Sequence, residues 1–149
     1  MWRMLVVVVW PVLAVAAEPG SRAEYIGGTL SDMPKTLGGR LLATDDLLLS
    51  FQAGDRLIRI PYDRINLLEY GQKADRRYLM AVLVSPIFIL SKKRSHFLTI
   101  GYADDAGRQQ ALVFRLEKKS VRGVLASLEA RTGRKVQYQD EEARKGGKD

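Results

Sequence analysis

The first half of the chain alternates short apolar runs with turn residues, a pattern typical of antiparallel strands. We expect five strands before residue 72, with turns every eight to twelve residues. Gly54 lies at one of these turns, where glycine can take the positive φ that a tight hairpin requires. This spacing favours an antiparallel sandwich or small barrel. The five expected strands cover residues 25–30, 37–43, 47–52, 56–61 and 65–70.

The second half begins with two β-rich runs, 96–102 and 110–116, which we expect to form a hairpin. The apolar period then changes from two to that of a helix, so the sequence predicts an amphipathic helix over 118–132. Gly133 follows it as a C-cap. Residues 135–139 favour a last short strand. The helix stripe consists of Val121, Val124, Leu125 and Leu128.

The most apolar segment of the mature chain, residues 78–90, lies between these two groups of strands. Its thirteen residues are too few to cross a bilayer as a helix, which takes about twenty. Pro86 interrupts it, so we expect a helical turn over 75–84, then a bend and an extended piece. Burial of its nine large apolar side chains would contribute roughly 13 to 27 kcal/mol gross. These are Leu79, Met80, Val82, Leu83, Val84, Ile87, Phe88, Ile89 and Leu90.

Basic residues flank this apolar run on both sides. Arg76 and Arg77 precede it, and Lys92, Lys93 and Arg94 follow it. Three hypotheses remain open at this stage. The run packs over the open end of the barrel; or it enters one leaflet of a membrane, with the flanking cations and Tyr78 at the headgroups; or it forms a protein-binding or self-associating surface.

The N-terminus carries a second apolar stretch with the features of a secretion signal. Arg3 gives a basic start, an apolar core runs to Leu13, and small residues follow at 14–17. We therefore expect a removed signal over residues 1–17, with an uncleaved anchor as the alternative. The predicted domain covers 24–138, and the polar residues 139–149 are expected to form a disordered tail.

Most of the net positive charge of the mature chain lies in one segment, residues 73–94. The chain has 24 Lys and Arg residues against 17 Asp and Glu residues. Loss of Arg3 with the signal leaves 23 against 17, a net charge of +6. Residues 73–94 alone carry six cations and one acid, a local net charge of +5. The rest of the chain is nearly neutral, which argues against a nucleic-acid-binding surface.

Candidate catalytic and metal-binding groups are few. His96 is the only histidine, and its position beside Lys92–Arg94 favours a role as a flank of the basic patch over that of a base. The chain has no cysteine, so disulfides, thiol nucleophiles and cysteine-ligated metals are excluded. Asp45–Asp46 and Asp104–Asp105 lie in predicted turns, where Asp caps backbone amides. We expect no catalytic residue, cofactor or metal site.

Two stretches of the chain resemble the GRAM and bacterial PH-like pattern. They are GRLLATDDLLLSF (39–51) and IPYDRINLLEY (60–70), which match a T-D-x-L-x-F hairpin followed by an I-P-Y-x-x-I corner. The chain also resembles uncharacterised secreted bacterial proteins that carry EYGQK and SKKRxHFLTIGY, here 69–73 and 91–102. The resemblance implies an α+β, PH-like antiparallel β-barrel or sandwich of about seven strands. One C-terminal helix and an apolar insertion between strands 5 and 6 complete that fold.

The resemblance implies a lipid- or protein-binding module, with one departure from the family. The first hairpin loop, 31–36, holds only Lys35, so phosphoinositide recognition is not carried over. We expect an exported, non-catalytic binding module associated with an anionic membrane surface. Its predicted contact residues are Arg76, Arg77, Tyr78, Leu79, Leu83, Ile87, Phe88, Lys92, Lys93 and Arg94. The alternative is an envelope or secreted module that binds an unidentified protein and packs 78–90 in its own core.

Overall fold

A computed structural model describes residues 20–72 and 95–148. Within them, eight strands form one sheet in the order β4-β3-β2-β1-β7-β6-β5-β8, and every pairing is antiparallel except that of β5 with β8. The predicted α+β class, with a C-terminal helix, is confirmed. The strands are β1 Ser21–Gly28, β2 Leu37–Leu42, β3 Leu48–Ala53, β4 Arg56–Pro61, β5 Ile65–Gly71, β6 His96–Ala103, β7 Gln109–Leu116 and β8 Gln137–Tyr138. The helices are the 3-10 turn η1 Tyr62–Arg64, α3 Lys118–Thr132 and α4 Glu141–Gly146.

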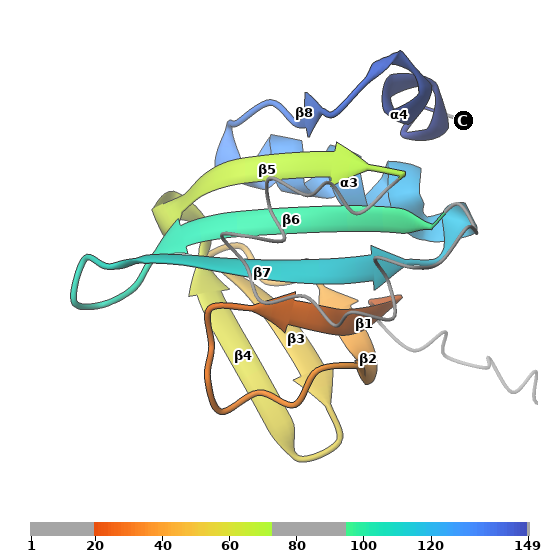
Figure 1. Cartoon of the computed structure of the whole chain (residues 1–149). Helices are drawn as coiled ribbons and strands as arrows, with labels where there is room; N and C mark the ends of the chain where they lie inside the picture. The colour runs from red at the N-terminus through yellow and green to blue at the C-terminus, as the bar shows by residue number, and fades with distance from the viewer. Residues whose placement is uncertain (1–19, 73–94, 149) are drawn as a thin grey trace, which may run out of the picture.

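The sheet bends so that its two halves enclose a common core. β5, β6, β7 and β1 run side by side across Figure 1, and β3 and β4 cross below them at a steep angle. Alternate side chains of each strand point to the same face. The inward-facing residues of both halves join one buried cluster, in which the Phe114 ring contacts Phe51 at a centroid distance of 4.9 Å.

Helix α3 covers this core with the stripe that its sequence predicts. Val121, Val124, Leu125 and Leu128 are all buried and belong to the same cluster as the strand residues. Gly133 ends the helix at φ 69°, in the left-handed region that favours glycine, and its N–H donates to the carbonyl of Glu129. The predicted helix and its C-cap are therefore both confirmed.

The hairpin turns also follow the predicted chemistry. Gly54, between β3 and β4, has φ 61°. The expected strand 25–30 is shifted: β1 begins at Ser21, because its ladder with β2 extends to the pair Ser21–Leu41. Strand β1 therefore begins before the predicted domain boundary at residue 24.

The C-terminal residues correct a second expectation. The polar composition of residues 139–149 predicts a disordered tail, but α4 occupies Glu141–Gly146. Asp140 caps this helix by accepting a hydrogen bond from the Ala143 N–H, and Ala143 is buried in the core cluster. A local cap and one small buried side chain hold the segment against the domain.

Candidate functional site

The sequence-predicted membrane or partner-binding residues, 76–94, lie outside the described residues, as do the predicted helical turn over 75–84 and the signal over 1–17. The structure instead describes the two points where residues 73–94, which we call the insertion, join the sheet. The N–H of Ser95 donates to the carbonyl of Gln72 at 3.3 Å. The insertion therefore leaves the sheet and returns to it at one place, between the end of β5 and the start of β6.

A polar chain lies directly beneath this place. The Gln72 side chain donates to the Tyr70 hydroxyl, which lies 2.6 Å from Nδ1 of His96. The two rings are stacked, with an interplanar angle of 13°. Burial raises the pKa of Tyr70 to about 12, so its phenol is neutral, and it donates to Nδ1 in the histidine tautomer that carries its proton on Nε2.

His96 is therefore more than a flank of the basic patch. Its ring is half-buried, and burial together with the nearby Lys118 ammonium lowers its pKa. The imidazole is neutral at pH 7 and serves as the end of a hydrogen-bond chain. The sequence signal for this role is weak, because β5 and β6 must pair before Tyr70 can meet His96.

A groove of about 580 Å³ opens beside His96, at the end of the sheet where the insertion joins it. Strands β1, β2 and β7 and the start of β6 form it. Its walls carry the side chains of three arginines, and two consecutive glycines of β2 contribute to its lining. We call this the arginine groove; its described lining is Arg22, Ala23, Glu24, Gly38, Gly39, Arg40, Ser95, His96, Arg115, Leu116 and Glu117.

Strand register explains how the arginines meet. Arg22 of β1 and Arg40 of β2 are direct cross-strand partners, so their side chains leave the same face of the sheet. Glu24 and Arg115 are partners in the next ladder and form an ion pair. A smaller hollow of about 310 Å³ shares Arg22, Arg40 and Glu117 with the groove. The two arginines therefore border both hollows.

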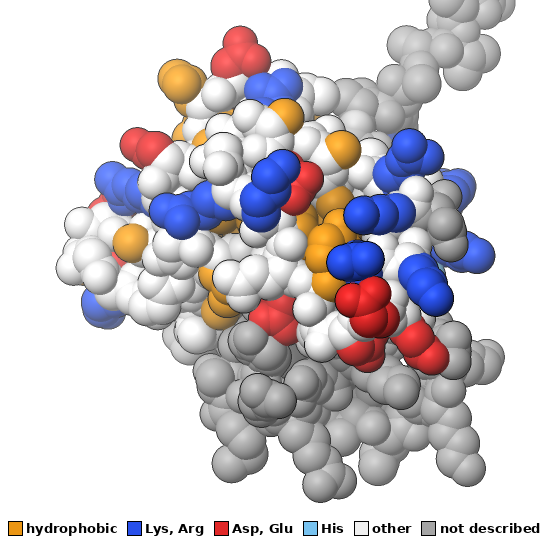
Figure 2. Space-filling model, turned by 90° about the horizontal axis from the view of Figure 1, so that it is seen from above, with side chains coloured by type: hydrophobic (Ala, Val, Ile, Leu, Met, Phe, Trp, Pro, Cys, Tyr) orange, Lys and Arg blue, Asp and Glu red, His pale blue; other side chains and the backbone are white. Residues whose placement is uncertain are grey.

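Basic residues outnumber acidic ones around the two hollows. Among the described lining residues, the cations Arg22, Arg40, Arg115 and Lys119 face the acids Glu24 and Glu117, a net charge of +2. Glu117 lies 3.9 Å from Arg22 and 3.2 Å from Lys119, so one carboxylate serves two cations. Figure 2 shows Lys and Arg side chains gathered at the right, the side on which α3 begins and α4 ends in Figure 1.

The chain matches none of the known protein-family models, and no curated protein shows significant similarity to it. Within residues 20–72 and 95–148, no three His, Cys, Asp or Glu side chains gather in a way that could hold a metal ion. No helix in the same residues is long and apolar enough to span a membrane.

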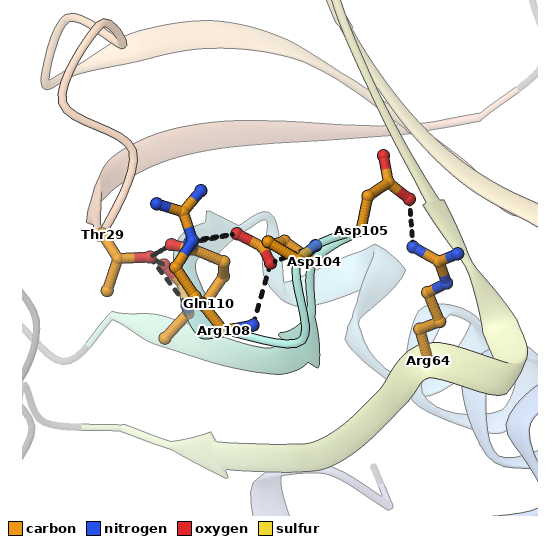
Figure 3. Close-up of polar contacts among 8 residues, drawn as sticks. Thr29, Arg64, Asp104, Asp105, Arg108 and Gln110 are labelled. Carbon is orange, nitrogen blue, oxygen red and sulfur yellow. Dashed lines mark hydrogen bonds and ion pairs between the residues drawn. The ribbon is translucent and has the colours of Figure 1, made fainter.

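The opposite end of the sheet holds a polar network around the β6–β7 turn (Figure 3). Asp104 Oδ1 accepts from the N–H groups of Ala106 and Arg108 at 3.0 and 2.9 Å. Hydrogen bonds from the Gln110 side chain and the Arg108 backbone lower the pKa of Asp104 to about 2. Gln110 also meets Thr29 after β1, and Asp105 pairs with Arg64 of η1.

These contacts identify Asp104 as a turn-capping residue, as its sequence position predicts. Asp45 has the same role in the turn before β3, where it accepts from the N–H groups of Leu47 and Leu48. Asp46 instead pairs with Arg131 of α3 at 3.0 Å. The acidic pairs of the sequence thus hold turns in place.

Sequence reasoning missed Arg22 and Arg40 as a pair. They are far apart in the chain, and only the β1–β2 register places them together. The available signal was the hairpin itself: extending the predicted first strand to Ser21 and pairing it with residues 37–42 brings both arginines to one face.

Proposed function

We propose that this protein is an exported, non-catalytic binding module that associates peripherally with a membrane through residues 78–90 and their flanking cations. In this proposal the domain has a PH-like fold. The strand order supports it, since four sequential strands and a second group of three meet at β1 and β7, and a C-terminal helix covers the core.

The observation that carries the proposal is the closed base of the insertion. Because Ser95 bonds to Gln72, residues 73–94 form an excursion from one point of the sheet. Arg76, Arg77, Lys92, Lys93 and Arg94 all lie near the ends of that excursion in the sequence, and the apolar run lies between them. Cations on both sides of an apolar run in the sequence suit insertion into one leaflet of an anionic bilayer.

Cations on the described surface, near the point where the insertion joins the sheet, would also face the membrane in this proposal. Arg22, Lys118 and Lys119 lie around the start of β1 and the start of α3, at the sheet end that the insertion shares with β7. Each cation near an anionic lipid surface contributes about 1 kcal/mol at most, so the apolar run supplies most of the affinity and the cations orient the domain.

A second face of the sheet supports the alternative, an interaction module that packs 78–90 on itself. Phe97, Thr99 and Val113 alternate with the core residues of β6 and β7, so they point away from α3. Their exposed fractions are nonetheless 6%, 6% and 5%. A sheet that is buried on both faces needs a second covering segment. Phe97 pairs with Gly71, the last residue of β5, so this buried face lies close to the point where the insertion begins.

A flotation assay separates the two proposals. The protein is mixed with vesicles of phosphatidylcholine containing rising fractions of phosphatidylglycerol, at low and high salt. The test variant is Leu83→Asp with Phe88→Asp. The matched control is Leu47→Asp with Leu57→Asp, which places the same charges on two apolar side chains that are already exposed.

Membrane association predicts that wild type and the control float with anionic vesicles and that the test variant stays in the soluble fraction. High salt should weaken flotation without abolishing it, because the apolar term remains. Wild type that stays soluble under every condition would rule the membrane proposal out. Loss of cooperative unfolding in the test variant would instead support packing of 78–90 within the domain.

A further inference from the structure

We propose that the C-terminal helix α4 places Lys145 and Lys148 against the headgroups of an anionic membrane, beside the insertion. This inference rests on the proposed function and extends its contact surface. It gives a role to a segment whose composition predicts only a polar tail.

Helix α4 is fixed at the end of the sheet from which the insertion leaves (Figure 1). Gly146 lies on the end of β5, because a Cβ added there would overlap the side chain of Gln72. Gly147 lies equally close to β8, since a Cβ there would lie 2.7 Å from the Tyr138 ring. Ala143 is buried in the core cluster. These contacts set the position of the helix relative to the base of the insertion.

The base of the insertion lies near the headgroups in the membrane-bound protein. Ser95, which closes this base, directly follows Arg94, one of the cations that the proposed function places at the headgroups. Lys145 and Lys148 are one and two residues from Gly146, and consecutive Cα atoms are about 3.8 Å apart. The Debye length is about 8 Å at physiological ionic strength. Both lysines are therefore close enough to be attracted by anionic lipid at the base.

The charges of α4 are divided along its length. Glu141 and Glu142 lie in its first turn, whereas Arg144 and Lys145 lie in its last turn and Lys148 follows. Arg144 pairs with Glu141 at 3.4 Å, but the structure gives Lys145 and Lys148 no ion pair with a described residue. Both lysines are exposed. The end of α4 that touches β5 is thus its cationic end.

Lys118 supplies a cation on the other strand of the base. Burial lowers the pKa of His96, the first residue of β6, and the Lys118 ammonium adds to this effect, so the two groups are neighbours. Helix α4 lies at the β5 side of the base and Lys118 at the β6 side. Attraction on both sides of the insertion would hold the domain in one orientation on the membrane, whereas attraction on one side would let it tilt.

Flotation with phosphatidylcholine vesicles containing phosphatidylglycerol tests this inference. The test variant is Lys145→Gln with Lys148→Gln. The matched control is Lys35→Gln with Lys135→Gln, which removes two exposed lysines that follow the far ends of β1 and α3. Urea unfolding confirms that both variants are folded. We expect about tenfold weaker vesicle binding in the test variant at low salt, a smaller loss at high salt, and binding like that of wild type in the control.

A single label reports the position of α4 directly. Because the chain has no cysteine, Lys148→Cys and Lys135→Cys each provide one site for a fluorophore. With vesicles that carry a spin label on the lipid headgroup, we expect stronger quenching at position 148 than at position 135.

The outcomes distinguish this inference from the proposed function. Wild type that does not float overturns both. Wild type that floats, with a test variant that floats equally well at low salt, overturns the role of α4 and leaves the proposed function standing. Equal quenching of the two labels on bound protein has the same consequence.

Discussion

The Tyr70 hydroxyl lies 2.6 Å from Nδ1 of His96, directly below the point where the insertion joins the sheet. In the neutral tautomer with the proton on Nε2, Nδ1 accepts a hydrogen bond from the Tyr70 hydroxyl. Burial, and after it Lys118, lower the pKa of His96 below its ordinary 6.5. The unfolded chain therefore takes up a proton at a higher pH than the folded one does.

The free energy of unfolding should consequently fall as the pH drops through 6.5 toward the folded-state pKa of His96, and this loss should level off below that value. We expect thermal unfolding of wild type to occur at a lower temperature at about pH 5 than at about pH 7.5. Asp45 and Asp104 titrate below this window. His96→Gln should remove most of the difference between the two pH values. An equal difference in wild type and His96→Gln would contradict this assignment.

Removal of two different tyrosine hydroxyls should change the free energy of unfolding in opposite directions. The Tyr62 hydroxyl is buried and has no hydrogen-bond partner among the described residues, whereas that of Tyr70 is bonded to His96. Tyr62→Phe should raise the free energy of unfolding by about 1 kcal/mol, because it removes an unsatisfied polar group. Tyr70→Phe should lower it by about 1 to 2 kcal/mol. Urea unfolding of both variants checks the pair, and a loss of stability in Tyr62→Phe would show that its hydroxyl has a partner.

Alanine substitutions at the two adjacent glycines of β2 should differ in their effect on the free energy of unfolding. A Cβ at Gly39 would lie 2.3 Å from the carbonyl oxygen of Gln52, whereas one at Gly38 meets nothing within 4 Å. We expect Gly39→Ala to lower the free energy of unfolding by about 1 to 3 kcal/mol. Gly38→Ala should stay within about 0.5 kcal/mol of wild type. Urea unfolding measures both, and similar values for the two variants would contradict the β2–β3 register.

The sheet and its main helix could be predicted because their signals are local. Period-two alternation marks β4, and the stripe through Val121 and Leu128 marks the buried side of α3. Helix α4 could not be predicted in this way, since its one buried residue, Ala143, gains its place from tertiary packing. Composition alone described that segment as a polar tail.

The arginine groove also could not be predicted from local sequence, because it depends on strand pairing. Nothing local connects Arg22 with Arg40, and the β1–β2 register alone makes them neighbours. His96 likewise gains its role from Tyr70 on another strand. Residues 78–90 present the converse case, because their apolar character is evident from the sequence but their surroundings lie outside the described residues.

The central claim, that residues 78–90 enter a membrane, is tested most directly by a single tryptophan at position 88. The chain has two tryptophans, Trp2 and Trp10, so Trp2→Phe, Trp10→Phe and Phe88→Trp together leave one reporter. A matched protein carries Leu57→Trp in place of Phe88→Trp, on an exposed strand position. Both are mixed with phosphatidylglycerol vesicles that contain phosphatidylcholine with brominated acyl chains.

The account predicts that the emission of the Phe88→Trp protein moves to shorter wavelength on addition of vesicles and is quenched by the brominated chains. The emission of the Leu57→Trp protein should be unchanged under the same conditions. Emission from the Phe88→Trp protein that is already at short wavelength without vesicles, and is not quenched by brominated lipid, would contradict the account and place the run inside the domain.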